Sequence, residues 1–124
     1  MKNTLSLNRN TLFKRAYSKG KSYANKYLAV YVLPGKQGFN RLGITVSKKI
    51  GCAVLRNKVR RRIKESYRLS EDIIKTGHVI VIVARMASAS ADYHKINSAL
   101  LHIMQKLELL KTGDNDEKNS NISD

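Results

Sequence analysis

The feature that most constrains the fold is the segment His78–Ala84, which reads HVIVIVA. Apolar residues follow one another here without alternation, which is typical of a strand that is covered on both of its faces. Gly77 breaks the chain immediately before this strand. A length of 124 residues permits one domain, which is stable alone provided that most of the chain is ordered.

Two more strands are predicted upstream. Residues 26–34 (KYLAVYVLP) are rich in β-branched and aromatic residues, and their alternation places Tyr31 on one face and Val30 on the other. Residues 41–47 (RLGITVS) form the second strand. The loop between the two is rich in glycine and short enough to predict an antiparallel hairpin.

Helices complete the pattern. Asn10 can cap a short helix over residues 11–18, and longer helices are expected over 53–69 and 91–110. The last helix has an apolar stripe for the core, formed by Ile96, Leu100, Ile103 and Leu107. The order helix, strand, strand, helix, strand, helix predicts an α/β two-layer sandwich, with the sheet on one side and the helices on the other.

The charge of the chain is strongly unbalanced, with 24 Lys and Arg residues against 9 acids. Residues 1–110 contain 22 of the bases and 5 of the acids, a net charge of +17. A field of this strength requires an anionic partner. Nucleic acid is the first candidate, and an anionic membrane surface is the second.

Composition divides the chain into three parts. Residues 1–9 are polar and basic and predict a flexible arm, residues 10–110 predict a single domain, and residues 111–124 are acidic and predict a disordered tail. The longest apolar run, residues 79–84, is too short to cross a bilayer, and no secretory signal is visible. The lone Cys52 forms no internal disulfide. We therefore expect a cytoplasmic protein without a membrane partner.

The central helix is unusually basic over Arg56–Arg68 (RNKVRRRIKESYR). At ~100° per residue, its apolar positions share one arc that should pack on the sheet. A second arc holds Asn57, Arg60, Arg61, Lys64 and Arg68 and contains no acid. The outward arc holds Lys58, Arg62 and Glu65. One interpretation of such a run is that it is merely a solvated face of the helix. The repulsion between like charges four residues apart favours the other interpretation, in which the face binds an external anion.

Asn57 stands among these cations although asparagine is a mediocre helix former. Its amide both donates and accepts hydrogen bonds, so it suits RNA sugar or base edges as well as a local capping role. The sequence leaves both roles open.

The segment 46–68, VSKKIGCAVLRNKVRRRIKESYR, resembles the signature of the bacterial ribonuclease P protein subunit. That signature has a Lys-Lys-x-Gly lead-in and an Arg-Asn-Arg helix with further basic residues at i+4 positions. The resemblance covers about residues 8–110. It departs at Cys52, Lys58 and Tyr17, where the family usually has Asn, Arg and Phe, and no charge or ring is lost by these changes.

The resemblance implies both a fold and a function. The fold would be a small mixed sheet flanked by helices, with a left-handed strand-helix-strand crossover where pattern alone predicts a right-handed one. The protein would bind the catalytic RNA of ribonuclease P and the precursor tRNA, and would assist the removal of the 5′ leader. The RNA would supply the active site and hold most of the Mg²⁺, and a 1:1 complex with RNA would require no protein partner.

Two surfaces would carry this function. The first would grip the phosphates of the catalytic RNA, with bidentate Arg contacts and point-charge Lys contacts that position the RNA without reading its sequence. It would consist of Lys48, Lys49, Arg56, Asn57, Arg60, Arg61, Lys64 and Arg68. The second would be a leader cleft between the sheet and the first helix, where unpaired bases stack on Phe13, Tyr17 and Tyr31. These three rings can also be ordinary core.

The sequence predicts no catalytic group in the protein itself. Among the acids of residues 1–110, only Glu71 and Asp72 are neighbours, and adjacent helical residues do not converge on one metal. The three histidines lack the spacing of metal ligands. A structural ribosomal-type RNA-binding protein without a processing role is the alternative function. A nuclease with its own active site is disfavoured because convergent acids and histidines are scarce.

Overall fold

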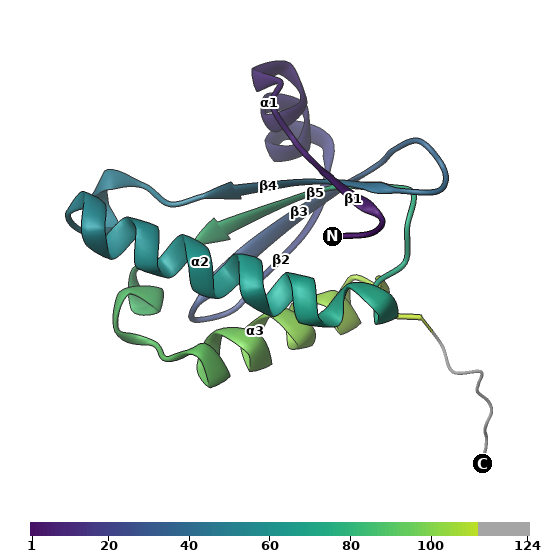
Figure 1. Ribbon diagram of the computed structural model, residues 1–124. Coiled ribbons are helices and arrows are strands. Elements are labelled where there is room, and N and C mark those ends of the chain that lie inside the picture. Colours follow the sequence, from purple (N-terminus) through teal and green to yellow (C-terminus); the bar gives the residue numbers. More distant parts are fainter. Residues whose placement is uncertain (112–124) are drawn as a thin grey trace, which may run out of the picture.

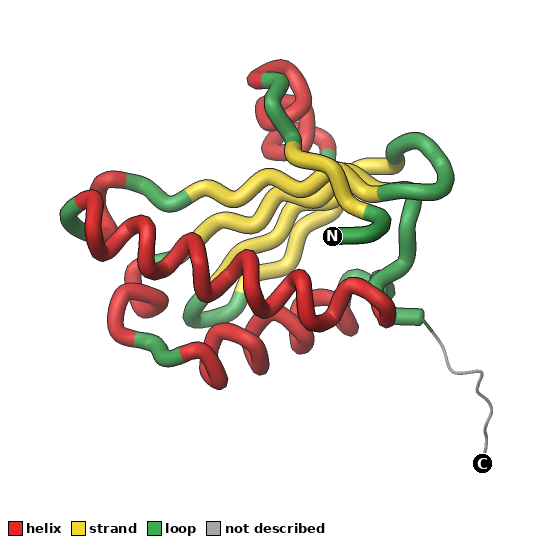
Figure 2. The backbone as a smooth tube through the Cα atoms, viewed as in Figure 1, coloured by secondary structure: helices red, strands yellow, loops and turns green. Residues whose placement is uncertain are grey.

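Five strands form one mixed sheet in the order β1-β4-β5-β3-β2 (Figures 1 and 2). The computed structural model describes residues 1–111, so the predicted disordered tail lies, except for Lys111, outside the described residues. The strands are β1 (Thr4–Ser6), β2 (Lys21–Ala24), β3 (Leu28–Pro34), β4 (Asn40–Thr45) and β5 (His78–Ala84). The α-helices are α1 (Asn10–Lys19), α2 (Ala53–Ser70) and α3 (Tyr93–Lys106), and the short 3-10 helices are η1 (Lys48–Ile50), η2 (Glu71–Ile73) and η3 (Met86–Ser90).

Strand β5 is covered on both faces, as its sequence predicted. Ile80 and Ile82 are fully buried in the main core, which is shared with α2 and α3. Val79 and Val81 belong to a second, smaller apolar cluster that includes residues of α1. Strand β3 divides its side chains between the same two clusters, in the alternation predicted for it.

The predicted hairpin between β3 and β4 is wrong, because β5 lies between these two strands. Strand β3 is antiparallel to β5, with Val30 opposite Ile82, and β4 is parallel to β5, with Ile44 opposite the same residue. In the central position, both edges of the most apolar strand pair with neighbouring strands, and both of its faces are covered by helices. A direct hairpin would have excluded β5 from that position.

Helix α2 connects β4 to β5, which are parallel neighbours. In Figure 1 both strands point to the left, α2 lies in front of them, and β5 lies below β4. When the view is turned so that the strands point up and α2 faces the viewer, β5 lies to the left of β4, which makes this connection a left-handed crossover. Most such connections are right-handed. The resemblance therefore predicted the handedness correctly where pattern alone would not have done so.

Helices cover both faces of the sheet, and not one face as the element order predicted. Helices α2 and α3 lie side by side on one face, where Ile63 of α2 and Leu100 of α3 are fully buried (Figure 1). Helix α1 packs on the other face against β3 and β5. Ala16 is its one fully buried side chain, so α1 covers its face of the sheet far less completely.

Two short strands were not predicted from the sequence. Strand β1 is parallel to β4, and the Leu7 N–H continues the pairing by donating to the Leu42 carbonyl at 2.9 Å. Residues 4–7 of the expected flexible arm therefore belong to the sheet, with Leu7 buried. Strand β2 pairs with the outer edge of β3. Both strands are short and largely polar, so they lack the apolar alternation that identifies a strand in a sequence.

Candidate nucleic-acid interface

Helix α2 buries one side and exposes the other. Val59, Ile63 and Tyr67 are fully buried, and they lie on the arc predicted to face the sheet. Apolar residues recur at helical spacing in α2, so they share one side of the helix. The basic residues between them in the sequence therefore lie on the remaining circumference. The core thus fixes which basic side chains of α2 face the solvent.

The residues predicted to bind RNA lie along this exposed side and in η1, the turn before it. Lys48, Lys49, Asn57, Arg60, Arg61, Lys64 and Arg68 are exposed. Arg56 is half-buried, and its Nε atom has no hydrogen-bond partner among residues 1–111. The Ser47 hydroxyl accepts a hydrogen bond from the Lys49 backbone and fixes the start of η1. The basic surface therefore continues from the turn onto the helix.

Arg68 differs from its predicted neighbours because it forms an ion pair. Its Nε and Nη2 atoms donate to the two carboxylate oxygens of Glu65 at 2.8 and 2.9 Å. The guanidinium lowers the pKa of the Glu65 carboxyl by donating hydrogen bonds to it. Glu65 is exposed, as its place on the outward arc predicted, but its side chain pairs with Arg68 of the cationic arc, since side chains three positions apart in a helix are neighbours. Arg68 therefore has a carboxylate partner within the protein.

Arg62 also differs from its expected role as an outward-facing charge. It is half-buried, and its Nη1 atom donates to the Ala91 carbonyl at 2.8 Å. This hydrogen bond ties α2 to the segment that leads into α3. Arg62 is therefore a structural residue of the helical layer.

Arg60 connects the basic side of α2 to the sheet. Its Nη1 atom donates to the Ile44 carbonyl of β4 at 2.7 Å. Arg60 and Lys64 line a groove of about 420 Å³ whose other walls come from β1, β4 and the ring of Phe13. The two predicted surfaces were expected to be separate, but at this groove they meet.

Phe13 packs tightly against β4 at Gly43. A Cβ atom at position 43 would lie 2.5 Å from Cζ of Phe13, so the glycine allows the ring to approach the strand. Phe13 is half-buried and also contacts the smaller apolar cluster. It thus serves as core on one side while it borders the groove on the other.

Tyr17 and Tyr31 form an edge-to-face pair on the α1 side of the sheet. Their ring centroids are 5.0 Å apart with an interplanar angle of 88°. The Tyr17 hydroxyl lies 3.2 Å from the Thr45 hydroxyl, which orients the ring over the end of β4. Tyr17 is 43% exposed, whereas Tyr31 is half-buried against the smaller cluster. The structure therefore brings all three predicted rings to one face, with Tyr17 the most accessible.

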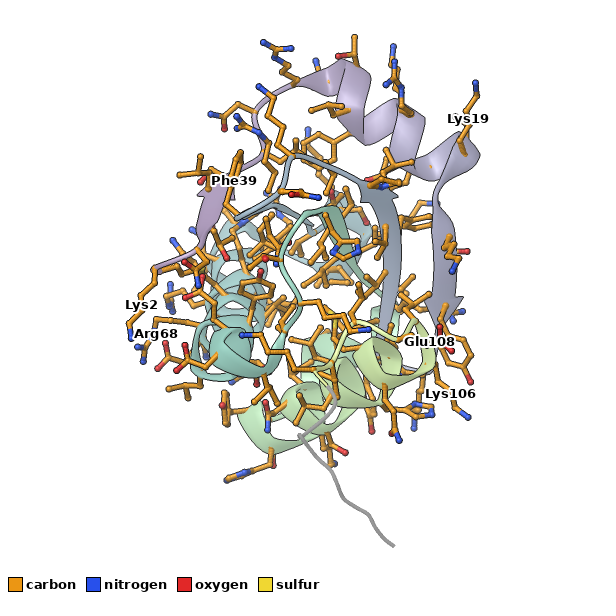
Figure 3. The ribbon with its side chains drawn as sticks, turned by 90° about the vertical axis from the view of Figure 1, so that its right-hand side faces the viewer. Lys2, Lys19, Phe39, Arg68, Lys106 and Glu108 are labelled. Carbon is orange, nitrogen blue, oxygen red and sulfur yellow. The ribbon has the colours of Figure 1, made fainter. Side chains whose placement is uncertain are left out.

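Glu71 has a role that sequence reasoning missed. Its carboxylate is 7% exposed and accepts hydrogen bonds from the backbone N–H groups of Lys2 and Asn3 and from the Thr4 hydroxyl. Burial alone would raise the pKa of this carboxyl, but the three donors outweigh burial and lower the pKa. Figure 3 shows Lys2 on the same side of the molecule as Arg68 near the end of α2. Glu71 thus anchors β1, one wall of the groove.

Tyr67 and Asn40 extend this anchor into the core. The Tyr67 hydroxyl lies 3.0 Å from the Thr4 hydroxyl and accepts a hydrogen bond from the Asn40 amide at 3.1 Å. Asn40 also accepts from the His78 N–H at 3.0 Å. Burial raises the pKa of the Tyr67 hydroxyl, so it remains protonated. The network joins β1, β4, β5 and the end of α2.

The described residues contain no group of three or more His, Cys, Asp or Glu side chains placed to hold a metal ion. Cys52 is a free, exposed thiol at the N-cap position of α2. The exposed carboxylate of Asp92 caps α3 by accepting from the Lys95 N–H at 2.9 Å. Asp92 thus has a structural role at a helix end, whereas the Cys52 side chain makes no capping hydrogen bond.

A family comparison decides between the kinds of RNA-binding protein. The sequence model of the family Ribonuclease P matches residues 1–108. The chain belongs to the ribonuclease P protein family. It is therefore a subunit of ribonuclease P, which acts in tRNA 5′ processing, and the ribosomal-type alternative is not favoured. Its RNA partner is that of the ribonuclease P complex.

Similar proteins span nearly the whole chain. The ribonuclease P protein component of Alkaliphilus metalliredigens is 46% identical over 110 residues, which cover 89% of this chain and 99% of that protein. The component of Clostridioides difficile is 42% identical over 107 residues, which cover 86% and 94%. Both alignments contain the basic helix and the strands around it.

Solved ribonuclease P proteins share the fold. The protein from Staphylococcus aureus matches with a TM-score of 0.74 and 32% identity, over 86% of this chain and 97% of that chain. The protein from Thermotoga maritima matches with a TM-score of 0.68 and 31% identity, over 76% and 87%. No helix within residues 1–111 is long and apolar enough to span a membrane.

Proposed function

We propose that this protein binds the catalytic RNA of ribonuclease P through one continuous surface, the basic face. The basic face consists of Lys48, Lys49, Arg56, Asn57, Arg60, Arg61, Lys64 and Arg68. The observation that carries the proposal is the absence of carboxylate partners: among residues 1–111 the one ion pair is Arg68 with Glu65. The other cations of the face are left with uncompensated charge, which suits RNA phosphates.

Contacts of this kind position an RNA without reading its sequence. Arginine forks bind phosphate oxygens in pairs, and lysine adds point charge. If about six contacts replace counterions, affinity falls by roughly three orders of magnitude over a fourfold rise in salt. Such a steep dependence distinguishes a phosphate-binding face from one that recognises bases.

The precursor leader binds beside the rings of Phe13, Tyr17 and Tyr31, which form the leader cleft. Unpaired bases stack on aromatic rings without sequence preference, at ~1–3 kcal/mol per base. Support comes from the exposure of Tyr17 and from the groove that joins Phe13 to Arg60 and Lys64. Cations beside rings are the combination that single-stranded RNA requires.

In this proposal the RNA carries out the cleavage and the protein assists. The RNA holds most of the Mg²⁺ and supplies the active site, in a complex of one protein with one catalytic RNA. The protein contributes charge that offsets phosphate repulsion, and a fixed path for the leader. Its effect is therefore greatest where free Mg²⁺ is too scarce to offset that repulsion alone.

The test is reconstitution of cleavage in low Mg²⁺ with catalytic RNA and precursor tRNA. Adding the protein should increase 5′ maturation strongly, and the absence of any gain would refute the proposal. The protein without catalytic RNA should leave the precursor intact. Cleavage by the protein alone would instead favour a nuclease with its own active site.

A further inference from the structure

A second groove lies outside both proposed surfaces. It has a volume of about 410 Å³ and is formed where α1 begins, where the loop after β3 turns, and where β4 and β5 start. Its floor is apolar and includes Leu7, Leu12 and Val79. We call it the loop groove.

The rim of the loop groove is basic. Arg9, Lys36 and Arg41 line it together with His78, and no acid is among its lining residues. None of these three cations is ion-paired with a carboxylate of residues 1–111. Helix α1 starts beside Arg9 without a side-chain cap and without an acid in its first turn, so its dipole adds to the positive field.

The loop that carries Lys36 and Phe39 is held in place by its backbone. The Gly35 N–H donates to the Gly77 carbonyl at 2.9 Å, and the Gly77 N–H donates to the Phe39 carbonyl at 3.0 Å. Gly77 has a φ of 90°, a conformation that favours glycine. The groove is therefore built on fixed backbone, and its shape does not depend on an unsupported loop.

Phe39 gives the loop groove an aromatic wall. The guanidinium carbon of Arg41 lies 5.6 Å from the centroid of the Phe39 ring, within the range of a cation–π contact. This contact places a charge over one face of the ring at the rim. A ring for a base next to a cation for its phosphate is the pattern of a single-stranded nucleic-acid site.

We propose that the loop groove binds a further nucleotide of the precursor leader, beyond those at the leader cleft. The base stacks at Phe39, and the phosphates contact Arg41, Lys36 and Arg9. The inference rests on the proposed function, which supplies the RNA.

The leader is favoured over the catalytic RNA by position. Leu7 and Asn8 line both the loop groove and the groove that holds Phe13, so the two adjoin. Two cations of α2, Arg60 and Lys64, line the groove that holds Phe13. No cation of α2 lines the loop groove. A strand that leaves the rings of the leader cleft can therefore continue into the loop groove without crossing the basic face.

The experiment measures the affinity of reconstituted holoenzyme for three RNAs: precursor with a long unpaired leader, precursor with the leader trimmed to a single nucleotide, and mature tRNA. A fourth measurement gives the affinity of the protein alone for catalytic RNA. Variants are Phe39→Leu, Arg41→Gln and Lys36→Gln. Lys106→Gln is the matched control, since it removes one exposed lysine charge at the end of α3, and Figure 3 shows Lys106 well away from Phe39.

We expect Phe39→Leu to weaken binding of the long-leader precursor about tenfold, as loss of one stacked base does. Lys36→Gln should lower the salt slope for that RNA by about 0.7, the value for one phosphate of a single strand. Trimmed precursor, mature tRNA and catalytic RNA should bind the variants as they bind the wild type. Lys106→Gln should leave all four affinities unchanged.

Three results would overturn the inference. Equal weakening for mature tRNA or for catalytic RNA would place the contact on another RNA. Unchanged binding in both Phe39→Leu and Arg41→Gln would leave the groove without a ligand. Equal effects of Lys36→Gln and Lys106→Gln would show that the net charge of the protein, and not a site in the loop groove, determines the affinity. A wild-type holoenzyme that does not prefer leader-bearing precursor would refute the leader cleft itself, which is a separate failure of the proposed function.

Discussion

The two faces of the sheet are built for different tasks. The main core on the α2 and α3 side contains twenty buried residues, whereas the cluster on the α1 side contains five, with Phe13 and Tyr31 half-buried at its border. Burial on the first face supplies most of the stability. The second face is left open enough for rings to be reached by a ligand. A small protein can thus expose aromatic residues on one side because the other side holds the fold together.

The largest expected effect would break this comparison at its stable side. Ile63 is fully buried between α2 and the sheet, so Ile63→Ala should lower the free energy of unfolding by about 3 kcal/mol. Tyr17 is 43% exposed, so Tyr17→Ala should lower it by less than about 1 kcal/mol. Denaturant unfolding of the two variants measures both values. Equal losses would mean that the α1 side is ordinary core.

The anchor of β1 sharpens the comparison at the edge where the two faces meet. Glu71→Gln removes a buried charge that three donors stabilise, and should cost about 2 kcal/mol. Asp72→Asn is the control, because Asp72 is an exposed neighbour. Thermal unfolding of both variants tests this expectation.

The effect of Glu71 should also depend on pH. Its pKa is lower in the folded protein than its ordinary value of 4.5, so its stabilising contribution is present above that value. The contribution is lost as the pH falls from 4.5 through the lower pKa of the folded state. The difference between the wild type and Glu71→Gln should therefore shrink below about pH 4. A constant difference down to acid pH would show that the charge is not what matters.

Loss of charge on α2 should affect RNA binding with little effect on stability. The double variant Arg60→Gln and Lys64→Gln should weaken assembly with catalytic RNA by about 1.5 kcal/mol, roughly tenfold. The salt slope should fall by about one for each phosphate contact removed. Lys58→Gln is the matched control for Lys64→Gln, since both are exposed lysines of α2. A filter-binding titration at several salt concentrations measures the affinity of each variant for catalytic RNA. Equal weakening by Lys58→Gln and by Lys64→Gln would mean that the position of the lost charge on α2 does not matter.

The smallest effect concerns the most accessible ring. Tyr17→Ala should weaken binding of leader-bearing precursor by about 1 kcal/mol, while Tyr17→Phe, which keeps the ring, should bind nearly as the wild type does. Mature tRNA should bind all three proteins alike. If Tyr17→Phe lost as much as Tyr17→Ala, the hydroxyl contact with Thr45 would matter and stacking would not.

The sequence was informative where a residue's environment is set by its near neighbours. The two-sided burial of β5 and the buried arc of α2 follow from periodicity, and both are confirmed. The pairing of Glu65 with Arg68 has a signal of the same local kind, since their spacing of three residues makes them neighbours on a helix.

Interactions between distant parts of the chain could not be predicted in this way. Strand β1 is held by Glu71, which is 67 residues from Thr4, and Arg62 reaches a carbonyl 29 residues away. The place of β5 between β3 and β4 depends on a competition among strands that no single segment reveals. For the same reason, the meeting of Phe13 with Arg60 and Lys64 in one groove was missed.

The central claim is that the basic face binds catalytic RNA while the rings on the α1 side bind the leader. The most direct test measures two affinities for each holoenzyme variant: protein for catalytic RNA, and holoenzyme for leader-bearing precursor relative to mature tRNA. We predict that the double variant Lys48→Gln and Lys49→Gln, which changes two exposed cations outside the groove that holds Phe13, alters the first affinity alone. Tyr17→Ala with Tyr31→Ala should alter the second ratio alone. Parallel loss of both quantities in both variants would contradict the division of the molecule into two surfaces.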